Sequence, residues 1–178
     1  MRERSRGQGV GLLSRNAILE QVPSLRRYAR ALLRDADRAD DLVQDCLERA
    51  LGRWHLWQPT GSLRSWLFTI MHNIHVNQAR QRTAMPPAVS LEASGPLAEP
   101  ARQIDQVALG ELAAALERLP EDQRQVLLLV TLEGFSYQDA AKTLGLPIGT
   151  VMSRLARGRE RLRQALSGEP PPALRRVK

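Results

Sequence analysis

Arginine side chains near the C-terminal end offer the clearest chemistry in the sequence. Five arginines lie between Arg154 and Arg163, with only Glu160 against them. Guanidinium groups bind phosphate oxygens and can donate paired hydrogen bonds to guanine O6 and N7 in the DNA major groove. The pattern therefore favours a nucleic-acid-binding face, and a helical hairpin with a merely solvated basic face is the alternative.

A capped helix is predicted just before this basic stretch. Ser136 and Asp139 form a capping box, so the helix should begin at Tyr137. Gly145 suits the left-handed position that follows a helix, where a Cβ would clash. The narrow apolar face of this helix is expected to consist of Ala140, Ala141 and Leu144.

A second helix carries the arginines and completes a predicted helix-turn-helix. Thr150 can help to cap it, and Val151 and Leu155 form its buried side at i, i+4 spacing. Ala141, Gly145 and Val151 are the close-approach, turn and plug positions that such a unit needs. The second helix of this motif enters the major groove with its first residues on base edges. Its outer face is expected to carry Met152, Ser153, Arg154 and Arg157.

The composition is that of a basic helical protein. The chain has 178 residues, which is enough for one or two small domains. Only 4% of the residues are aromatic while 43% are hydrophobic, so the cores must be built from Leu, Val, Ile and Ala, as in an all-α fold. The net charge of +7 points to a polyanionic partner, most simply a nucleic acid.

The single cysteine and the apolar runs bear on the compartment. Cys46 has no partner for an intramolecular disulfide and lies on an apolar helical face, which predicts a small core residue. No run approaches the roughly 18 apolar residues of a membrane span. Residues 1–15 are basic and predicted to be disordered, without the apolar stretch of a signal peptide. We therefore expect a cytoplasmic protein without membrane insertion.

Three helices are predicted within a domain spanning residues 16–83. The first can begin at Pro23, because proline is tolerated in a first turn. A turn is expected at residues 34–36, after which Asp37 can cap the second helix, with Asp40 three residues later. The buried stripe of the second helix is expected to consist of Val43, Leu47, Ala50 and Trp54, broadened by Leu42, Cys46 and Leu51.

The other face of the second helix is acidic in a chain that is otherwise basic. Acidic residues near a helix N-terminus are favoured by the helix dipole, so a solvated face is one interpretation. A docking face for a basic protein surface is the other, and the physics alone does not choose between them. The face consists of Asp40, Asp41, Gln44, Asp45 and Glu48.

A loop at residues 55–63 carries Trp57 and leads to the third helix, which Ser62 with Ser65 can start. The buried side of this helix is expected to consist of Leu63, Trp66, Leu67, Ile70 and Ile74. A separate polar stripe consists of Thr69, Asn73, Asn77 and Arg80. Amide side chains can read base edges, and an aromatic loop beside them can stack an unpaired base; the alternative is an ordinary polar helix surface.

Neither a metal site nor an active site is expected. His72 and His75 are spaced i, i+3, whereas i, i+4 is the commoner spacing for two helical histidine ligands, and their helix offers no Cys, Asp or Glu partner. One cysteine, no glycine-rich phosphate loop and no credible acid–base cluster argue against an enzyme. We therefore predict no catalytic residues and no cofactor.

A second helical domain is predicted after a linker at residues 84–103, which is rich in Pro, Ala and Ser. The domain spans residues 104–167, and the tail at residues 168–178 is predicted to be disordered. Pro120 should start the helix that precedes the helix-turn-helix, and Gly134 should end it. The apolar residues expected in its core are Ala108, Leu112, Ala115, Leu119, Val126, Leu127 and Val130.

Roughly residues 15–166 resemble a bacterial sigma factor of the extracytoplasmic-function (ECF) type, the smallest class of the sigma-70 family. ADDLVQDCLERA is similar to region 2.2, and SLRSWLFTIMHNIHVNQARQR is similar to regions 2.3 and 2.4. LPEDQRQVLLLVTLEGFSYQDAAKTLGLPIGTVMSRLARGRERL is similar to region 4 and is very specific. The resemblance implies two helical domains that direct core RNA polymerase to promoters by their −10 and −35 elements.

The resemblance also implies roles for particular residues. The surface that binds the β′ clamp helices of core polymerase corresponds to Asp40, Asp41, Gln44 and Asp45. The −10 side, with a loop that pockets a flipped base, corresponds to Trp57, Ser62, Asn73, Asn77 and Arg80. The −35 side corresponds to Thr150, Ser153, Arg154 and Arg157, whereas Met152 departs from the Lys or Arg that is frequent there. The polymerase β flap, promoter DNA and an anti-sigma factor are the further partners implied.

A stand-alone helix-turn-helix regulator that binds duplex DNA is the competing function. Such a regulator leaves residues 16–83 with no role beyond dimerisation or ligand sensing. It also has no need for an acidic face on the second helix. The acidic face therefore discriminates between the two functions.

Overall fold

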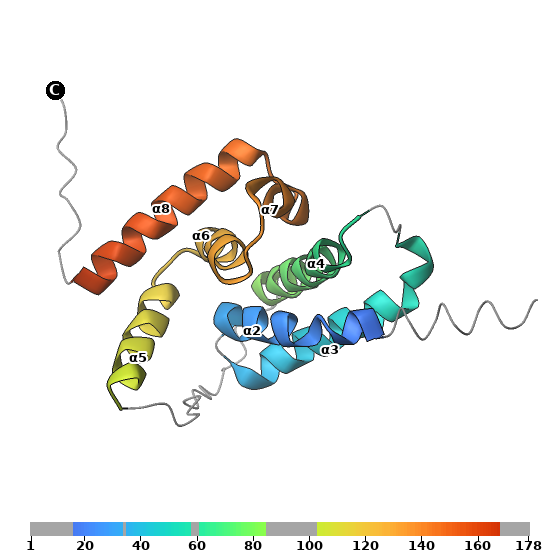
Figure 1. Ribbon diagram of the computed structural model, residues 1–178, viewed down its shortest axis with the longest axis horizontal. Helices are drawn as coiled ribbons and strands as arrows, with labels where there is room; N and C mark the ends of the chain where they lie inside the picture. Colours follow the sequence, from blue (N-terminus) through green and yellow to red (C-terminus); the bar gives the residue numbers. More distant parts are fainter. Residues whose placement is uncertain (1–15, 34, 58–60, 85–102, 168–178) are drawn as a thin grey trace, which may run out of the picture. The chain divides into compact units, whose positions relative to one another are not determined.

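The described residues of this computed structural model are 16–33, 35–57, 61–84 and 103–167, and they form helices and turns without a strand (Figure 1). The chain divides into two compact units, whose main bodies are helices α2–α4 and helices α5, α6 and α8. The all-α prediction is therefore confirmed. The predicted disordered ends and most of the predicted linker lie outside the described residues.

The first unit is a three-helix arrangement with α3 at its centre. Helix α3 (Ala36–Gly52) packs against both α2 (Val22–Leu33) and α4 (Leu63–Ala84), and the short 3₁₀ turn η1 (Trp54–Leu56) follows it. The ring of Tyr28 meets that of Phe68 edge to face, with 5.3 Å between centroids. The fully or nearly fully buried residues of α2 and α3 are Leu25, Tyr28, Ala29, Leu32, Ala39, Leu42, Val43, Cys46 and Ala50.

Two predictions for α3 were wrong. Asp35, not Asp37, is the N-cap: its carboxylate accepts a hydrogen bond from the Arg38 amide at 3.0 Å, so the helix begins at Ala36. Leu51 does not broaden the buried stripe, because it is 48% exposed in the last turn of the helix. Leu47 and Trp54 are only half-buried.

Helix α4 begins as predicted but buries a wider side than its periodicity indicated. The Ser62 hydroxyl accepts a hydrogen bond from the Ser65 amide at 3.3 Å and so caps the helix. Leu67, Ile70 and Ile74 are buried, while Leu63 and Trp66 are half-buried. The sequence analysis missed three buried residues of this helix: Phe68, Met71 and His75.

In the second unit, helix α8 packs against α6 and α5. The bounds are Gln103–Glu117 for α5, Glu121–Leu127 for α6 and Ile148–Ser167 for α8. Pro120 precedes α6 as predicted, and the helix continues into a π-helical turn, η2 (Leu128–Leu132). Gly134 follows with a φ of +67°, which ends this helical run at the predicted residue. The core residues of this unit include Ala115, Leu119, Val126, Leu127, Leu128, Leu129, Val151 and Leu155.

Helix α7 (Tyr137–Leu144) and the turn after it follow the prediction closely. The Ser136 hydroxyl accepts a hydrogen bond from the Asp139 amide at 3.0 Å and donates one to the Asp139 carboxylate at 2.6 Å. Gly145 has a φ of +63°, which L-residues other than glycine adopt at a cost. The amides of Gly145 and Leu146 donate to the carbonyls of Lys142 and Ala141, respectively, the two bonds of a Schellman motif.

The predicted cap of α8 was wrong. The helix begins at Ile148, so Thr150 lies inside its first turn. The carbonyl of Pro147 accepts hydrogen bonds from the Thr150 and Val151 amides at 2.9 and 3.2 Å. Proline at that point therefore starts the helix earlier than the threonine suggested.

Candidate nucleic-acid interface

The outer face of α8 presents short polar, apolar and cationic side chains in its first three turns. Ser153 and Arg157 are exposed and Thr150 is half-buried, while Val151 and Leu155 on the opposite side are buried as predicted. The Ser153 hydroxyl donates to the Thr150 carbonyl at 3.1 Å. The guanidinium of Arg157 donates to the Ser153 carbonyl at 3.2 Å, which holds this cation along the helix surface.

Arg154 points toward α6 rather than freely outward. Its Nε lies 3.1 Å from the Asp122 carboxylate, and its side chain is 26% exposed. Asp122 lies in the first turn of α6, so the ion pair connects α6 with α8. The sequence analysis missed this role of Asp122, because the two residues are separated by the π-helical turn and α7.

Further along α8, Arg163 is held by its neighbour Glu160. The guanidinium makes two hydrogen bonds with the carboxylate, of 2.8 and 3.1 Å, and Gln164 donates a third at 2.7 Å. The hydrogen bonds from Arg163 and Gln164 lower the pKa of the Glu160 carboxyl. Arg161, on the same helix, is exposed.

In the first unit, the predicted polar stripe lies on the surface of α4. Asn73, Asn77 and Arg80 are exposed, and their side chains make no hydrogen bond or ion pair within the described residues. Thr69 is partly buried, and its hydroxyl donates to the Ser65 carbonyl at 2.8 Å. Asn73 and Asn77 thus present two exposed amide groups one helical turn apart, and Arg80 follows them on the helix surface.

Three tryptophans gather before and at the start of α4. The ring of Trp54 lies 4.8 Å from that of Trp57 and 6.1 Å from that of Trp66, measured between centroids. The indole nitrogen of Trp57 is buried and has no hydrogen-bond partner among the described residues. From the sequence, only Trp57 was predicted to stack a base, whereas Trp54 and Trp66 were predicted to be buried. Residues 58–60 of the predicted base-binding loop lie outside the described residues, and Ser62 is the cap of α4.

The carboxylates of the predicted acidic face of α3 differ in whether they pair with another described residue. Asp40 lies 3.7 and 3.6 Å from the guanidinium nitrogens of Arg26 and Arg30 in α2. Asp45 accepts a hydrogen bond from Gln78 of α4 at 3.1 Å. Asp41 is exposed and makes no ion pair or hydrogen bond with other described residues. Gln44 donates to Glu48 at 3.0 Å.

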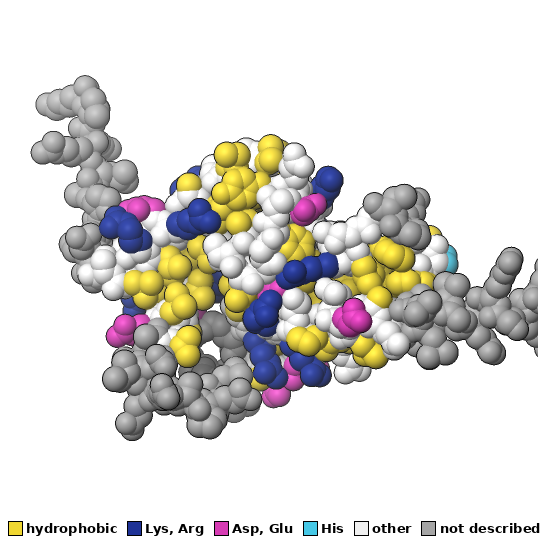
Figure 2. Space-filling view, in the orientation of Figure 1, with side chains coloured by type: hydrophobic (Ala, Val, Ile, Leu, Met, Phe, Trp, Pro, Cys, Tyr) yellow, Lys and Arg dark blue, Asp and Glu magenta, His cyan; other side chains and the backbone are white. Residues whose placement is uncertain are grey.

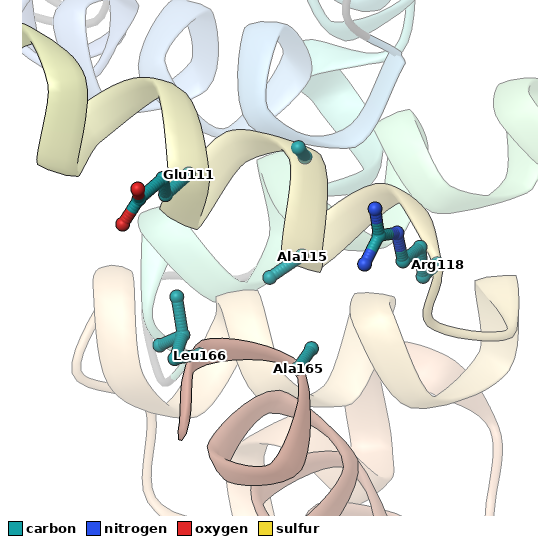
Figure 3. A pocket seen from close by; sticks show the side chains of 6 residues that line it. Glu111, Ala115, Arg118, Ala165 and Leu166 are labelled. Atoms are coloured by element: carbon teal, nitrogen blue, oxygen red, sulfur yellow. The ribbon is translucent and has the colours of Figure 1, made fainter. Parts of the chain in front are cut away.

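A shallow hollow of about 270 Å³ lies between α5 and α8 of the second unit (Figure 3). Its carboxylate and guanidinium are Glu111 and Arg118, and the rest of its lining is Ala114, Ala115, Ala165 and Leu166. This lining contains no nucleophile and no histidine. The described residues also hold no group of three or more His, Cys, Asp or Glu side chains that could bind a metal ion.

Two family models match the chain in the same order as its two units. The sigma-2 domain of PhyR matches residues 18–72, and region 4 of sigma-70 matches residues 109–162. The ECF RNA polymerase sigma factor EcfG of Rhodopseudomonas palustris is 43% identical over 148 residues, which cover 83% of this chain and 82% of that protein. This chain belongs to the ECF sigma factors.

Other relatives agree with this assignment. SigM, an ECF sigma factor of Mycobacterium tuberculosis, is 35% identical over 142 residues, covering 80% of this chain and 71% of that protein. The sigma factor RpoE of Bartonella quintana, solved in complex with the anti-sigma factor NepR, superposes with a TM-score of 0.72 at 32% identity. That match covers 88% of this chain and 98% of the other.

The sigma factor therefore acts with RNA polymerase in transcription initiation, and its C-terminal helix-turn-helix belongs to a DNA-binding region 4. The stand-alone regulator is not favoured, because the likeness to sigma factors extends over both units. No known enzymatic activity attaches to this family. Among the described residues, no helix has the length and apolar character needed to cross a membrane.

Proposed function

We propose that this sigma factor docks on the β′ clamp helices of core polymerase through the acidic face of α3. Asp41 supports the proposal because it is exposed and pairs with no other described residue, so a basic surface can approach it without displacing one of them. Asp45 and Gln44 flank it and are also exposed. Asp40 contributes less, since two arginines of α2 already lie against its carboxylate.

The −10 element is proposed to contact the polar stripe of α4. The observation that carries this part is the hydrogen bond between Asp45 of α3 and Gln78 of α4, because it joins the docking face to the helix that bears Asn73 and Asn77. Core polymerase bound to the acidic face of α3 would therefore hold promoter DNA close to the polar stripe of α4. Flipping a base costs a few kcal/mol, which stacking on the tryptophan cluster and hydrogen bonds to the amides must offset.

The −35 element is proposed to contact the outer face of α8. Ser153 and Arg157 are the exposed polar readers, with Thr150 beside them. Arg154 is proposed to position the helix through its ion pair with Asp122, in place of the base contact predicted from the sequence. Tethering both units to one polymerase raises their effective concentration on one promoter, so each element can be bound weakly.

An anti-sigma factor is the proposed inhibitor. The RpoE relative was solved with the anti-sigma factor NepR, and its match covers most of both chains. Because polymerase and promoter DNA are the proposed partners, the proposed compartment is the cytoplasm.

Run-off transcription with purified core polymerase on genomic DNA fragments tests the proposed function. The full chain should yield discrete transcripts that share upstream elements at −35 and −10 spacing. Transcripts that appear equally without the protein would refute it. Binding to duplex promoter DNA without polymerase, at the affinity reached with polymerase, would favour the stand-alone regulator instead.

A further inference from the structure

An apolar stripe runs along the outer face of the first turns of α8. Ile148 is 44% exposed and Met152 is 51% exposed, and they are one helical turn apart at i, i+4 spacing. Ala156 continues the stripe and is exposed as well. Packing inside the unit does not explain why these side chains are apolar, because Val151 and Leu155 form the buried side of the same helix.

The stripe adjoins the polar readers of the same helix. Ser153 follows Met152, and Arg157 follows Ala156, so two of the three apolar positions have a polar neighbour on the outer face. In Figure 2, hydrophobic side chains gather over the beginning of α8, with basic side chains near them. An apolar strip bordered by a hydroxyl and a guanidinium group fits a polyanion with an apolar feature better than it fits an apolar protein surface.

Duplex DNA offers one such feature in the major groove, the C5-methyl group of thymine. The groove is otherwise lined by hydrogen-bond donors and acceptors, which an unbranched thioether or an isoleucine side chain cannot satisfy. Residues one turn apart on a helix are separated by about 6 Å along its axis, roughly twice the rise between base pairs. Ile148 and Met152 can therefore face different base pairs.

We propose that Met152, assisted by Ile148, contacts thymine methyl groups, so that the −35 element contains an A·T pair at the position facing Met152. This inference rests on the proposed contact between α8 and the −35 element. Met152 is then a specificity-determining residue that selects against G·C at that position, where an arginine would select for guanine.

The test removes the methyl group and nothing else. A library with a randomised −35 segment is selected with holoenzyme assembled from core polymerase and the full chain. The selected promoter is then synthesised with each −35 thymine, on either strand, replaced singly by deoxyuridine. One replacement is expected to lower the rate of open-complex formation about fourfold, the effect of losing one buried methyl group. The holoenzyme with Met152→Ala should be indifferent to that replacement.

Ser153→Ala is the matched control, because Ser153 is the exposed neighbour of Met152 and should retain the uracil sensitivity. Met152→Arg should shift the selected base pair from A·T to G·C with guanine facing the helix. Uracil without effect on the unsubstituted protein, or equal sensitivity in Met152→Ala, would overturn the thymine contact while leaving −35 reading intact. The proposed −35 reading itself fails only if Ser153→Ala and Arg157→Ala also leave the selected −35 sequence unchanged.

Discussion

The polar surfaces of the two units differ in how far their side chains are already engaged. In the first unit, Asp41, Asn73 and Asn77 are exposed and make no hydrogen bond or ion pair with other described residues. In the second unit, Arg154 and Arg163 pair with carboxylates and Arg157 bonds its own helix. These three side chains of the first unit can meet a partner without giving up a bond to another described residue, whereas the second unit holds these cations in place beforehand.

This difference predicts different consequences of mutation. Removing an uncommitted side chain should remove only its contact with the partner, because nothing inside the unit depends on it. Removing a committed cation should also release its carboxylate, which then faces DNA as an unpaired negative charge. Reversing a charge adds repulsion to the loss of the contact, so the largest effect is expected where two exposed carboxylates of the docking face are changed to arginine.

Reversing charge on the docking face should have the largest effect. Asp41→Arg with Asp45→Arg is expected to abolish binding to core polymerase and to leave the unit folded, since both side chains are exposed and the loss inside the described residues is one hydrogen bond, from Gln78 to Asp45. Pull-down with purified core enzyme measures it, and circular dichroism verifies the fold. Glu20→Arg with Glu111→Arg is the control, because it changes the net charge equally at two other exposed positions. Full binding by the folded Asp41/Asp45 variant would refute docking through this face.

Removing the amide group of Asn73 should have the next largest effect on transcription. Asn73→Ala is expected to lower transcription from a duplex promoter by about 5- to 160-fold, the range for one lost base contact of about 1–3 kcal/mol. The loss should be smaller on a template mismatched across the −10 region, because capture of the opened strand is then no longer needed. Gln81→Ala, at an exposed position later in the same helix, serves as the control. Equal losses on both templates would show that Asn73 reads bases without assisting opening.

Breaking the ion pair between α6 and α8 should have a moderate effect. Arg154→Ala, Asp122→Ala and the double substitution are expected to reduce −35 discrimination alike, because the pair acts as one positioning unit. The pair is partly exposed, so it contributes at most about 1 kcal/mol, or about fivefold. Exchanging the two residues should restore part of the discrimination. If Arg154→Ala alone relaxes preference at particular −35 positions, the guanidinium contacts bases itself.

Removing the guanidinium of Arg163 should have the smallest effect on transcription. Its partner Glu160 has a lowered pKa, so the pair's contribution is present above the unfolded pKa of glutamate and is lost as pH falls through the lowered folded value. Arg163→Ala should raise the pKa of Glu160 toward its ordinary value, as measured by carboxyl NMR titration. It should also weaken all promoters alike and reduce the salt dependence by about one phosphate contact. An unchanged Glu160 titration would show that the pair does not form in solution.

The parts of the fold that depend on neighbouring residues were predicted well. The Ser136 cap, the left-handed Gly145 and the Ser62 cap each follow from chemistry within a few positions of the chain. The two wrong caps failed for the same reason. Asp37 and Thr150 are both acceptable cap residues, but Asp35 and Pro147 offered the helix an earlier start. Alternative helix starts that lie two or three residues apart are not separated by residue preference alone.

The parts that depend on distant residues were missed. Phe68, Met71 and His75 are buried because α4 has a wide buried side, which periodicity reads as a weaker signal. The pairing of Asp122 with Arg154 depends on how α6 and α8 pack, and no local pattern encodes it. Caps and turns, which depend on nearby residues, could therefore be predicted from the sequence. The partners that the site residues have elsewhere in the chain could not.

Cys46 gives this sigma factor a built-in means of following its own unfolding. Its thiol is fully buried between α3 and α4, where it donates to the Leu67 carbonyl at 3.4 Å, and burial raises its pKa to about 12. A thiol-reactive dye can therefore reach the sulfur only when these helices separate. The chain has no other cysteine, so the labelling rate reports the opening of the first unit alone. Comparing that rate for the free and polymerase-bound protein would measure how strongly docking suppresses local unfolding.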